Sequence, residues 1–190
     1  MAEQGMTDRM TTRTWKLIET PKGTVRLRRP VKTDGTDVHA LIARCAPLDR
    51  NSLYMNLIQC DHFADTCVIA EQGDRLMGWV SAHVPPGRGD TIFVWQVAVD
   101  ARARGMGLGR HMLQALLERP ACNDVTRLET TITEDNDGSW ALFRGLARRI
   151  DGALAHKPHY VSDRHFDGAH DTEHLVSIDF PAEEAQRSAA

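Results

Sequence analysis

The chain has 190 residues, of which 42% are hydrophobic, and this suits one globular domain with one core. The formal net charge of −3 argues against a nucleic-acid-binding protein, because phosphate backbones are bound by basic patches. No apolar run approaches the ~20 residues that cross a bilayer, and the polar stretch 1–14 lacks the apolar centre of a secretion signal. We therefore expect a cytoplasmic protein without a membrane partner.

The first elements in chain order are a strand and two helices. Residues 24–28 alternate apolar and polar side chains, which predicts a strand. Thr33 or Asp34 can cap a helix that follows, and Ser52 can start a second one. We expect residues 1–22 to be a flexible extension ahead of this region.

Three strands are predicted next. Residues 66–71 and 76–84 flank a hairpin turn at Gly73–Asp74. Residues 91–100 form a long, mostly apolar run, which indicates a central strand of the sheet.

The second half of the chain adds two helices. The first begins after a glycine-rich turn at Leu108 and ends before Pro120. Residues 127–133 predict a strand, and residues 136–149 predict the second helix. The remainder is irregular and rich in histidine, with a last strand at 174–180. The order of elements indicates a single domain over 23–180, of the mixed α/β or α+β sandwich class, and a disordered tail over 181–190.

Four cysteines are present, and no two of them are spaced as C-x-x-C. A zinc or redox site requires closer ligand spacing. We therefore expect buried free thiols in a reducing compartment. The four are Cys45, Cys60, Cys67 and Cys122.

The turn over residues 104–110 is the most informative segment. Its three glycines let the backbone approach a ligand, and the N–H groups at the start of the following helix bind anions. Arg104 and Arg110 add positive charge. A dinucleotide fingerprint needs a glycine where Arg110 stands, and the chain has no Gly-Lys followed by Ser or Thr as a P-loop requires. The expected ligand is a phosphate or pyrophosphate bound in another way.

Arg104-x-x-Gly107-x-Gly109, directly after a long apolar strand, resembles the pyrophosphate loop of the GCN5-related N-acetyltransferase superfamily. The resemblance extends from Val25 to Phe180. It implies a central mixed, mostly antiparallel sheet with splayed fourth and fifth strands and flanking helices. It also implies acetyl-CoA as the co-substrate, with its pantetheine arm between the splayed strands. The cofactor-binding residues that it implies are Val97, Val99, Arg104, Gly105, Gly107, Leu108, Gly109, Arg110 and Asn136.

Six segments are similar to a narrower family, the L-2,4-diaminobutyrate acetyltransferases of ectoine biosynthesis. This resemblance implies transfer of acetyl from acetyl-CoA to the 4-amino group, giving N4-acetyl-L-2,4-diaminobutyrate in a pathway of osmotic stress. It also implies a homodimer, and we expect no metal. The segments are 48–54, 60–67, 93–99, 129–133, 136–143 and 170–173.

The acceptor carries two ammonium groups and a carboxylate, so its site needs acids and polar groups. We expect Asp49 and Glu173 to hold the ammonium end by charge-assisted hydrogen bonds. Trp95 can either pack in the core or line the site as a wall. Asn51 can bind the carboxylate or cap the helix that follows, and capping is favoured. The acceptor-binding residues implied are Asp49, Asn51, Tyr54, Trp95, Glu129, Thr131, His170 and Glu173.

The nucleophile must be a neutral amine, and an amine near the reference lysine pKa of ~10.4 costs about 4–5 kcal/mol to deprotonate at pH 7. The second ammonium lowers this cost by repulsion. Candidates for the base are Glu129, His170 and a water chained to Asp49. Glu129 can equally be a structural acceptor.

The oxyanion and the leaving thiolate need donors. The backbone N–H of Val97 is the expected oxyanion donor. In the family a tyrosine often assists the thiolate, but Phe143 stands at that position here and has no proton to donate. Either Tyr54 supplies a hydroxyl, or no side-chain acid is used.

Three alternatives remain open. The segment 170–174 fits H-x-x-E-H, a zinc-peptidase pattern that requires a helix. An acetyl-CoA-binding protein without catalysis would keep the same fold. An acetyltransferase for another small diamine, an aminoglycoside or a protein lysine would keep the chemistry, since one methylene is worth only ~1–3 kcal/mol of discrimination.

Overall fold

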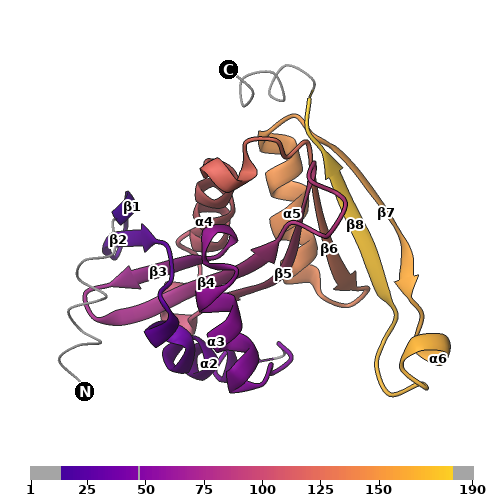
Figure 1. Ribbon diagram of the computed structural model, residues 1–190, viewed down its shortest axis with the longest axis horizontal. Coiled ribbons are helices and arrows are strands. Elements are labelled where there is room, and N and C mark those ends of the chain that lie inside the picture. Colours follow the sequence, from indigo (N-terminus) through magenta and orange to yellow (C-terminus); the bar gives the residue numbers. More distant parts are fainter. Residues whose placement is uncertain (1–13, 47, 182–190) are drawn as a thin grey trace. The chain divides into compact units, whose positions relative to one another are not determined.

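The computed structural model describes residues 14–46 and 48–181 (Figure 1). The contacts divide the chain into two compact units, each built from separate stretches of sequence. Of the described residues, unit 1 comprises 14–83 and 96–122, and unit 2 comprises 84–95 and 123–181. The single domain expected over 23–180 stays a prediction, and residues 182–190 of the expected tail lie outside the described residues. Within the described ranges, no helix is long and apolar enough to span a membrane.

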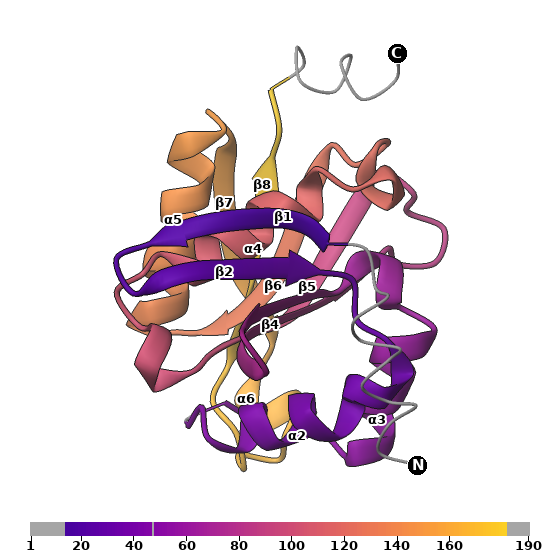
Figure 2. The ribbon, with the colours of Figure 1, turned by 90° about the vertical axis from the view of Figure 1, so that its left-hand side faces the viewer.

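Unit 1 contains four strands that pair antiparallel in chain order: β1 (Thr14–Thr20), β2 (Gly23–Arg28), β3 (Val68–Gln72) and β4 (Arg75–His83). For residues 14–20, β1 corrects the expectation of a flexible extension over 1–22, because this strand forms a hairpin with β2 (Figure 2). Among residues 15–20, Trp15 and Leu17 are exposed and only Ile18 is buried, so the strand lacks the regular alternation of buried and exposed side chains that marks a core strand. Residues 1–13 lie outside the described part of the chain.

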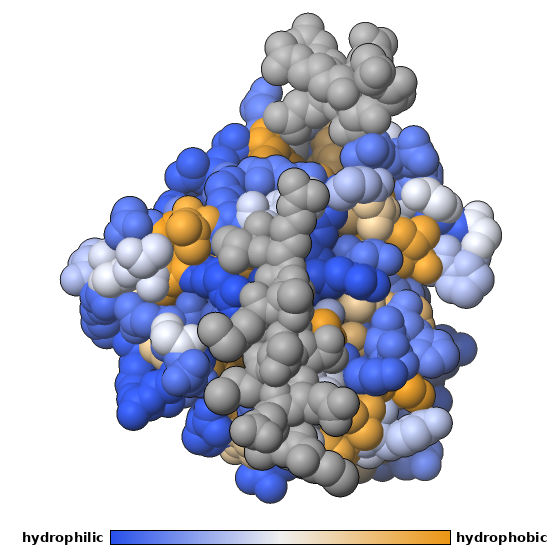
Figure 3. All heavy atoms as spheres, turned by 60° about the vertical axis from the view of Figure 1, so that its left-hand side comes forward, coloured by the Kyte–Doolittle hydropathy of each residue, from blue (hydrophilic) through white to orange (hydrophobic). Residues whose placement is uncertain are grey.

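The helices of unit 1 are α2 (Gly35–Ala43), α3 (Leu53–Asp61) and α4 (Leu108–Leu117), with short 3₁₀ turns at Lys32–Asp34, Ala64–Thr66, Ala101–Ala103 and Pro120–Cys122. A core with side chains from α2, α3, β3 and β5 surrounds the fully buried Trp79 of β4. α4 lies against β4 so closely that a Cβ at Gly78 would come within 2.8 Å of the Met112 side chain. The exposed large hydrophobic residues among the described part of unit 1 lie on β1, on α3 and at Phe63 shortly after α3, and the hydrophobic surface in Figure 3 forms separate patches.

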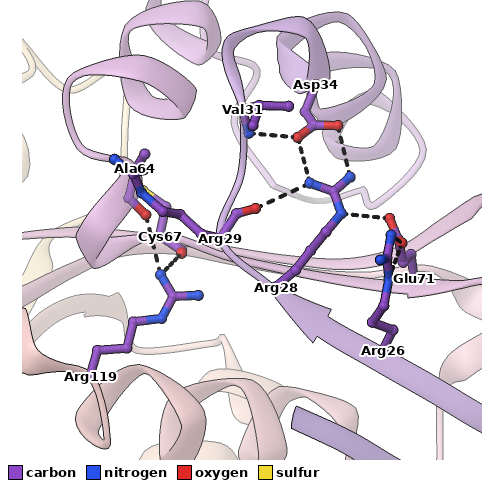
Figure 4. Close-up of polar contacts among 9 residues, drawn as sticks. All are labelled: Arg26, Arg28, Arg29, Val31, Asp34, Ala64, Cys67, Glu71 and Arg119. Atoms are coloured by element: carbon purple, nitrogen blue, oxygen red, sulfur yellow. Dashed lines mark hydrogen bonds and ion pairs between the residues drawn. The ribbon is translucent and has the colours of Figure 1, made fainter. Parts of the chain in front are cut away.

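A buried ionic network joins β2 to α2 and β3 (Figure 4). The Arg28 guanidinium is 1% exposed and donates to both carboxylate oxygens of Asp34, at 2.7 and 2.9 Å, and to Glu71 at 2.8 Å. Glu71 also pairs with Arg26. Asp34 occupies the N-cap position of α2, as the sequence predicts, but its side chain forms no capping bond. Its carboxylate accepts hydrogen bonds from the buried Arg28 guanidinium instead, because a guanidinium removed from water needs a counterion.

Unit 2 contains the start of β5 (Thr91–Val99), β6 (Arg127–Thr133), α5 (Asp137–Arg149), β7 (Ala153–Tyr160), α6 (Ser162–His165) and β8 (Glu173–Asp179). The strands follow the order β5-β6-β8-β7, with β5 and β6 parallel and the other pairs antiparallel. β7 and α6 replace the irregular region that the sequence predicts. Nearly every β7 side chain is exposed, so no apolar periodicity marks this edge strand.

The expected splay of the two central strands stays a prediction, and the register describes their parallel pairing. β5 and β6 pair only from Thr91 opposite Arg127 to Phe93 opposite Glu129. Both strands continue beyond that level, and β6 keeps its pairing with β8 to the end. The four cysteines are free and buried, as predicted.

Candidate active site

The segment between α2 and α3 presents Asp49 and Asn51, and both are attached to Gln96 of β5. Gln96 Nε2 donates to the carbonyl oxygen of Asp49 at 2.8 Å, and Asn51 Nδ2 donates to Gln96 Oε1 at 3.1 Å. The preferred capping role of Asn51 is wrong, because the hydroxyl of Ser52 accepts from Met55 N at 3.1 Å and caps α3. The Asn51 side chain is therefore directed to the strand.

Tyr54 stands in the first turn of α3 and is 72% exposed. Its hydroxyl is therefore accessible to a ligand. Phe143, at the position where the family often has a tyrosine, is 2% exposed and packs in the interior. Whether Tyr54 acts as an acid stays a prediction.

One face of the unit 2 sheet gathers four of the predicted acceptor residues. Phe93 lies opposite Glu129, and Thr133 lies opposite Glu173. Because alternate residues of a strand share a face, Trp95, Glu129, Thr131 and Glu173 project from the same side of this sheet. Trp95 is 46% exposed, so the alternative that it packs in the core is wrong.

Glu129 is fixed by a partner that sequence reasoning missed. Arg88, in the loop before β5, donates from Nη1 to Glu129 Oε2 at 2.8 Å. The Glu129 side chain is 5% exposed and that of Arg88 is 49% exposed. The arrangement supports a structural acceptor more than a base, because this carboxylate already has a cation bound to it. No local sequence signal pairs these two residues, which are 41 positions apart.

Glu173 begins β8, and His170 lies in a bend three residues before it. His170 Nε2 is 4.0 Å from Glu173 Oε1, and its Nδ1 is 2.8 Å from the carbonyl oxygen of Asp171. The ring also contacts that of Phe166. The segment 170–174 runs from a bend into a strand, so it lacks the helix that the zinc-peptidase pattern requires. Among residues 14–46 and 48–181, no three histidine, cysteine or acidic side chains are grouped as metal ligands.

Unit 2 also has an open pocket of about 540 Å³ next to this segment. Three acids line it, so it favours a cationic ligand over an anionic one. The sequence patterns pointed to the segment 170–174 but not to Glu134, Asp135 or Ser162. The lining consists of Glu134, Asp135, Ser162, Asp171, Thr172 and His174.

The predicted pyrophosphate loop lies in unit 1, at the start of α4. Gly105 and Gly107 have φ values of +79° and +67°, which explains why glycine stands at both positions. α4 begins at Leu108 without a side-chain cap, so its first backbone N–H groups lack intrahelical partners and can bind an anion. Arg104 is exposed, and the buried Arg110 Nε has no hydrogen-bond partner in the described structure. Such a loop fits the pyrophosphate of a nucleotide cofactor.

Asp100 anchors the beginning of this loop. Its carboxylate accepts from Arg102 N, Nε and Nη2 at 2.8 to 3.0 Å. The hydrogen bond from the Arg102 side chain holds the pKa of Asp100 well below its usual range, against the opposing effect of burial. The loop is thereby fixed at the end of β5, next to Val97 and Val99, which are half-buried.

Asn136, the last predicted cofactor residue, caps α5. Its Oδ1 accepts from Ser139 N at 3.0 Å. The cap uses only the side-chain oxygen, so the amide nitrogen of Asn136 retains its donors. Its contact with the cofactor stays a prediction.

Comparison with known proteins gives one consistent result. Residues 36–147 match the family model "Acetyltransferase (GNAT) family". The chain is 49% identical over 154 residues to an L-2,4-diaminobutyric acid acetyltransferase of Methylotuvimicrobium alcaliphilum, covering 81% of this chain and 90% of the relative. It is 48% identical over 152 residues to the Vibrio cholerae protein of the same name, covering 80% and 87%.

A solved structure is similar over a comparable range. It is the diaminobutyrate acetyltransferase EctA from Paenibacillus lautus, in complex with its substrate L-2,4-diaminobutyric acid and coenzyme A. The TM-score is 0.79 at 38% identity, over 82% of this chain and 94% of that one.

Proposed function

Since this chain belongs to the GNAT family of acetyltransferases, we propose that it transfers acetyl from acetyl-CoA to the 4-amino group of L-2,4-diaminobutyrate. The product is N4-acetyl-L-2,4-diaminobutyrate. The observation that supports this most is the likeness to the Paenibacillus lautus enzyme, which binds both diaminobutyric acid and coenzyme A. Relatives of the same name in two further organisms support the same acceptor.

The residues around α4 suit acetyl-CoA. Positive φ values at Gly105 and Gly107 bring the backbone near a ligand, and the free N–H groups of the α4 start point along the helix axis. Arg104 and Arg110 supply charge for the pyrophosphate. Bound acetyl-CoA supplies an activated thioester, whose carbonyl carbon the amine attacks as the C–S bond breaks.

The acceptor is bound by acids in this proposal. Asp49 and Glu173 hold its ammonium groups, and the half-exposed Trp95 packs against its methylene carbons. The N–H of Val97 donates to the oxygen that becomes negative during attack. Thr131 shares a sheet face with Trp95 and Glu173 and completes the polar lining.

The proton of the acceptor amine leaves through His170 or through a water held by Asp49. We assign Glu129 a positioning role because Arg88 already binds its carboxylate. Tyr54, exposed on α3, is the candidate donor to the leaving thiolate. The role in ectoine biosynthesis under osmotic stress, the homodimer and the cytoplasmic location are parts of the same proposal. Four buried free thiols support a reducing compartment.

The test is thiol release from acetyl-CoA with four acceptors: L-2,4-diaminobutyrate, its homologues one methylene shorter and longer, and a lysine peptide. We expect the highest kcat/KM with diaminobutyrate, and NMR of the product should show acetylation at N4. Activity with another amine only would contradict the acceptor but keep the acetyltransferase. Absence of thiol release with every acceptor would contradict catalysis.

A further inference from the structure

Gln96 is a buried polar residue on β5 to which the proposed mechanism gives no role. It is 8% exposed, and burying an amide costs free energy unless its donors and acceptor are used. Both ends of the amide are used, one by the Asp49 carbonyl and one by the Asn51 side chain. A primary amide is the neutral side chain that donates and accepts from one planar group, so this pairing is specific for Gln or Asn chemistry.

The two bonds attach an irregular segment to a strand. Residues 48–52 have no regular secondary structure, and Asp49 itself is exposed. The same segment is attached at its start, where the Cys45 thiol donates to the Val99 carbonyl at 3.4 Å and Leu48 packs against the core. Positions 45, 49 and 51 are therefore all attached to positions 96 and 99 of β5. Without Gln96, Asp49 and Asn51 would lose the two hydrogen bonds that attach them to this side chain of β5.

We propose that Gln96 is a positioning residue that fixes the acceptor-binding segment relative to the reacting strand. This inference rests on the proposed function, in which Asp49 holds the acceptor and the N–H of Val97 receives the oxyanion. Gln96 precedes Val97 directly in β5, so one residue links the acceptor ligand to the acetyl site. A displacement of about 1 Å in such a site can lower the rate 10²-fold.

If Gln96 had a purely structural role, its substitution would lower stability and would change the kinetics with diaminobutyrate and with acetyl-CoA equally. A positioning role affects the acceptor more than the cofactor, because both side-chain hydrogen bonds of Gln96 go to the acceptor-binding segment, at Asp49 and Asn51. Gln59 provides a matched control: it is 2% exposed, lies in α3 of the same unit, and accepts one hydrogen bond from Asn56 at 3.1 Å.

The experiment compares Gln96→Met with Gln59→Met and the wild type. We expect Gln96→Met to lower kcat/KM for diaminobutyrate by about 10- to 100-fold while the KM for acetyl-CoA stays within about twofold. Gln59→Met should keep the wild-type kcat/KM for diaminobutyrate, even if its thermal stability falls as far as that of Gln96→Met. Equal acceptor kinetics in the two variants, or equal losses for both substrates in Gln96→Met, would overturn the proposal.

Two further readouts separate this inference from the proposed function. Hydrogen exchange of the peptide covering residues 48–54 should be faster in Gln96→Met and unchanged in Gln59→Met, whatever amine the enzyme acetylates. The double variant Asn51→Ala/Gln96→Met should lose no more kcat/KM for diaminobutyrate than Gln96→Met alone, since both changes break the same linkage. Unchanged exchange in Gln96→Met, or additive losses, would contradict the linkage. A wild type inactive with diaminobutyrate would contradict the proposed function alone.

Discussion

Arg88 and Glu129 form an ion pair between a half-exposed arginine and a buried carboxylate. Nη1 of Arg88 lies 2.8 Å from Oε2 of Glu129, and the two side chains are 49% and 5% exposed. The carboxylate is thus buried on the sheet face that also presents Trp95 and Thr131, while its counterion reaches it from a surface loop. Removal of the arginine would leave a buried charge without this partner. The ion pair therefore matters mainly because it gives the buried carboxylate a counterion.

We predict that Arg88→Met lowers the free energy of unfolding by about 1–3 kcal/mol, because a buried acceptor loses a charged donor. Urea unfolding of the variant and the wild type measures this. Arg127→Met is the matched control, since Arg127 and Asp179 are 45% and 46% exposed and such exposed pairs contribute about 0–1 kcal/mol. Equal losses in both variants would show that burial of Glu129 does not matter.

Glu129→Gln tests the assignment of Glu129 as a positioning group. The amide oxygen can still accept from Arg88, so kcat should stay within about fivefold of the wild type. Loss of a general base would lower kcat by about 10²- to 10⁴-fold. A loss of that size in a folded variant would identify Glu129 as the base.

Asp49→Asn and Glu173→Gln should each raise the KM for diaminobutyrate by about 10-fold or more, because a charge-assisted hydrogen bond becomes a neutral one. The KM for acetyl-CoA should not change. Asp61→Asn, an exposed acid at the end of α3, serves as the control. Wild-type acceptor kinetics in both site variants would remove these acids from the site.

Tyr54→Phe should lower kcat by about 10-fold or more if the hydroxyl protonates the leaving thiolate. Tyr160→Phe, which removes the other tyrosine hydroxyl of the chain, should leave kcat unchanged. Steady-state kinetics of the two variants decide the matter. Equal kcat values for Tyr54→Phe and the wild type would mean that no tyrosine acts as the acid.

Gly107→Ala should raise the KM for acetyl-CoA and lower stability by about 1–2 kcal/mol, since an alanine at a φ of +67° is strained. The added Cβ would also lie 3.4 Å from the Arg110 guanidinium. Gly89→Ala is the control, because its Cβ would meet open space. Calorimetric titration with coenzyme A measures the loss directly, and an unchanged affinity would place the pyrophosphate elsewhere.

The Asp100–Arg102 pair predicts a pH dependence of stability. The folded-state pKa of Asp100 is depressed by Arg102, so the pair stabilises the fold above the unfolded pKa of ~3.9, and this contribution is lost as the pH falls below that value. Unfolding free energies of the wild type and Asp100→Asn should therefore differ at pH 6 and converge in acid. Arg102→Met should show the same convergence. A constant difference down to pH 2 would contradict the pairing.

Local elements and the family could be predicted from the sequence. The strand expected at 127–133 coincides with β6, Ser52 caps α3, and Gly105 and Gly107 of the α4 loop occupy positive-φ positions. These features depend on residues within a few positions of one another, where capping, turn and periodicity rules apply. The acetyltransferase family inferred from Arg104, Gly107 and Gly109 is confirmed by the comparisons.

Only the tertiary structure decided the rest. The bonds of Gln96 to Asn51 and Asp49 join positions 45 and 47 residues apart, and those of Arg88 to Glu129 join positions 41 apart. No local pattern encodes such pairs, because chain folding alone brings them together. β1 and β7 were missed for a related reason: their side chains are largely exposed, so backbone pairing with β2 and β8 defines them, and backbone pairing leaves no periodic trace in the sequence.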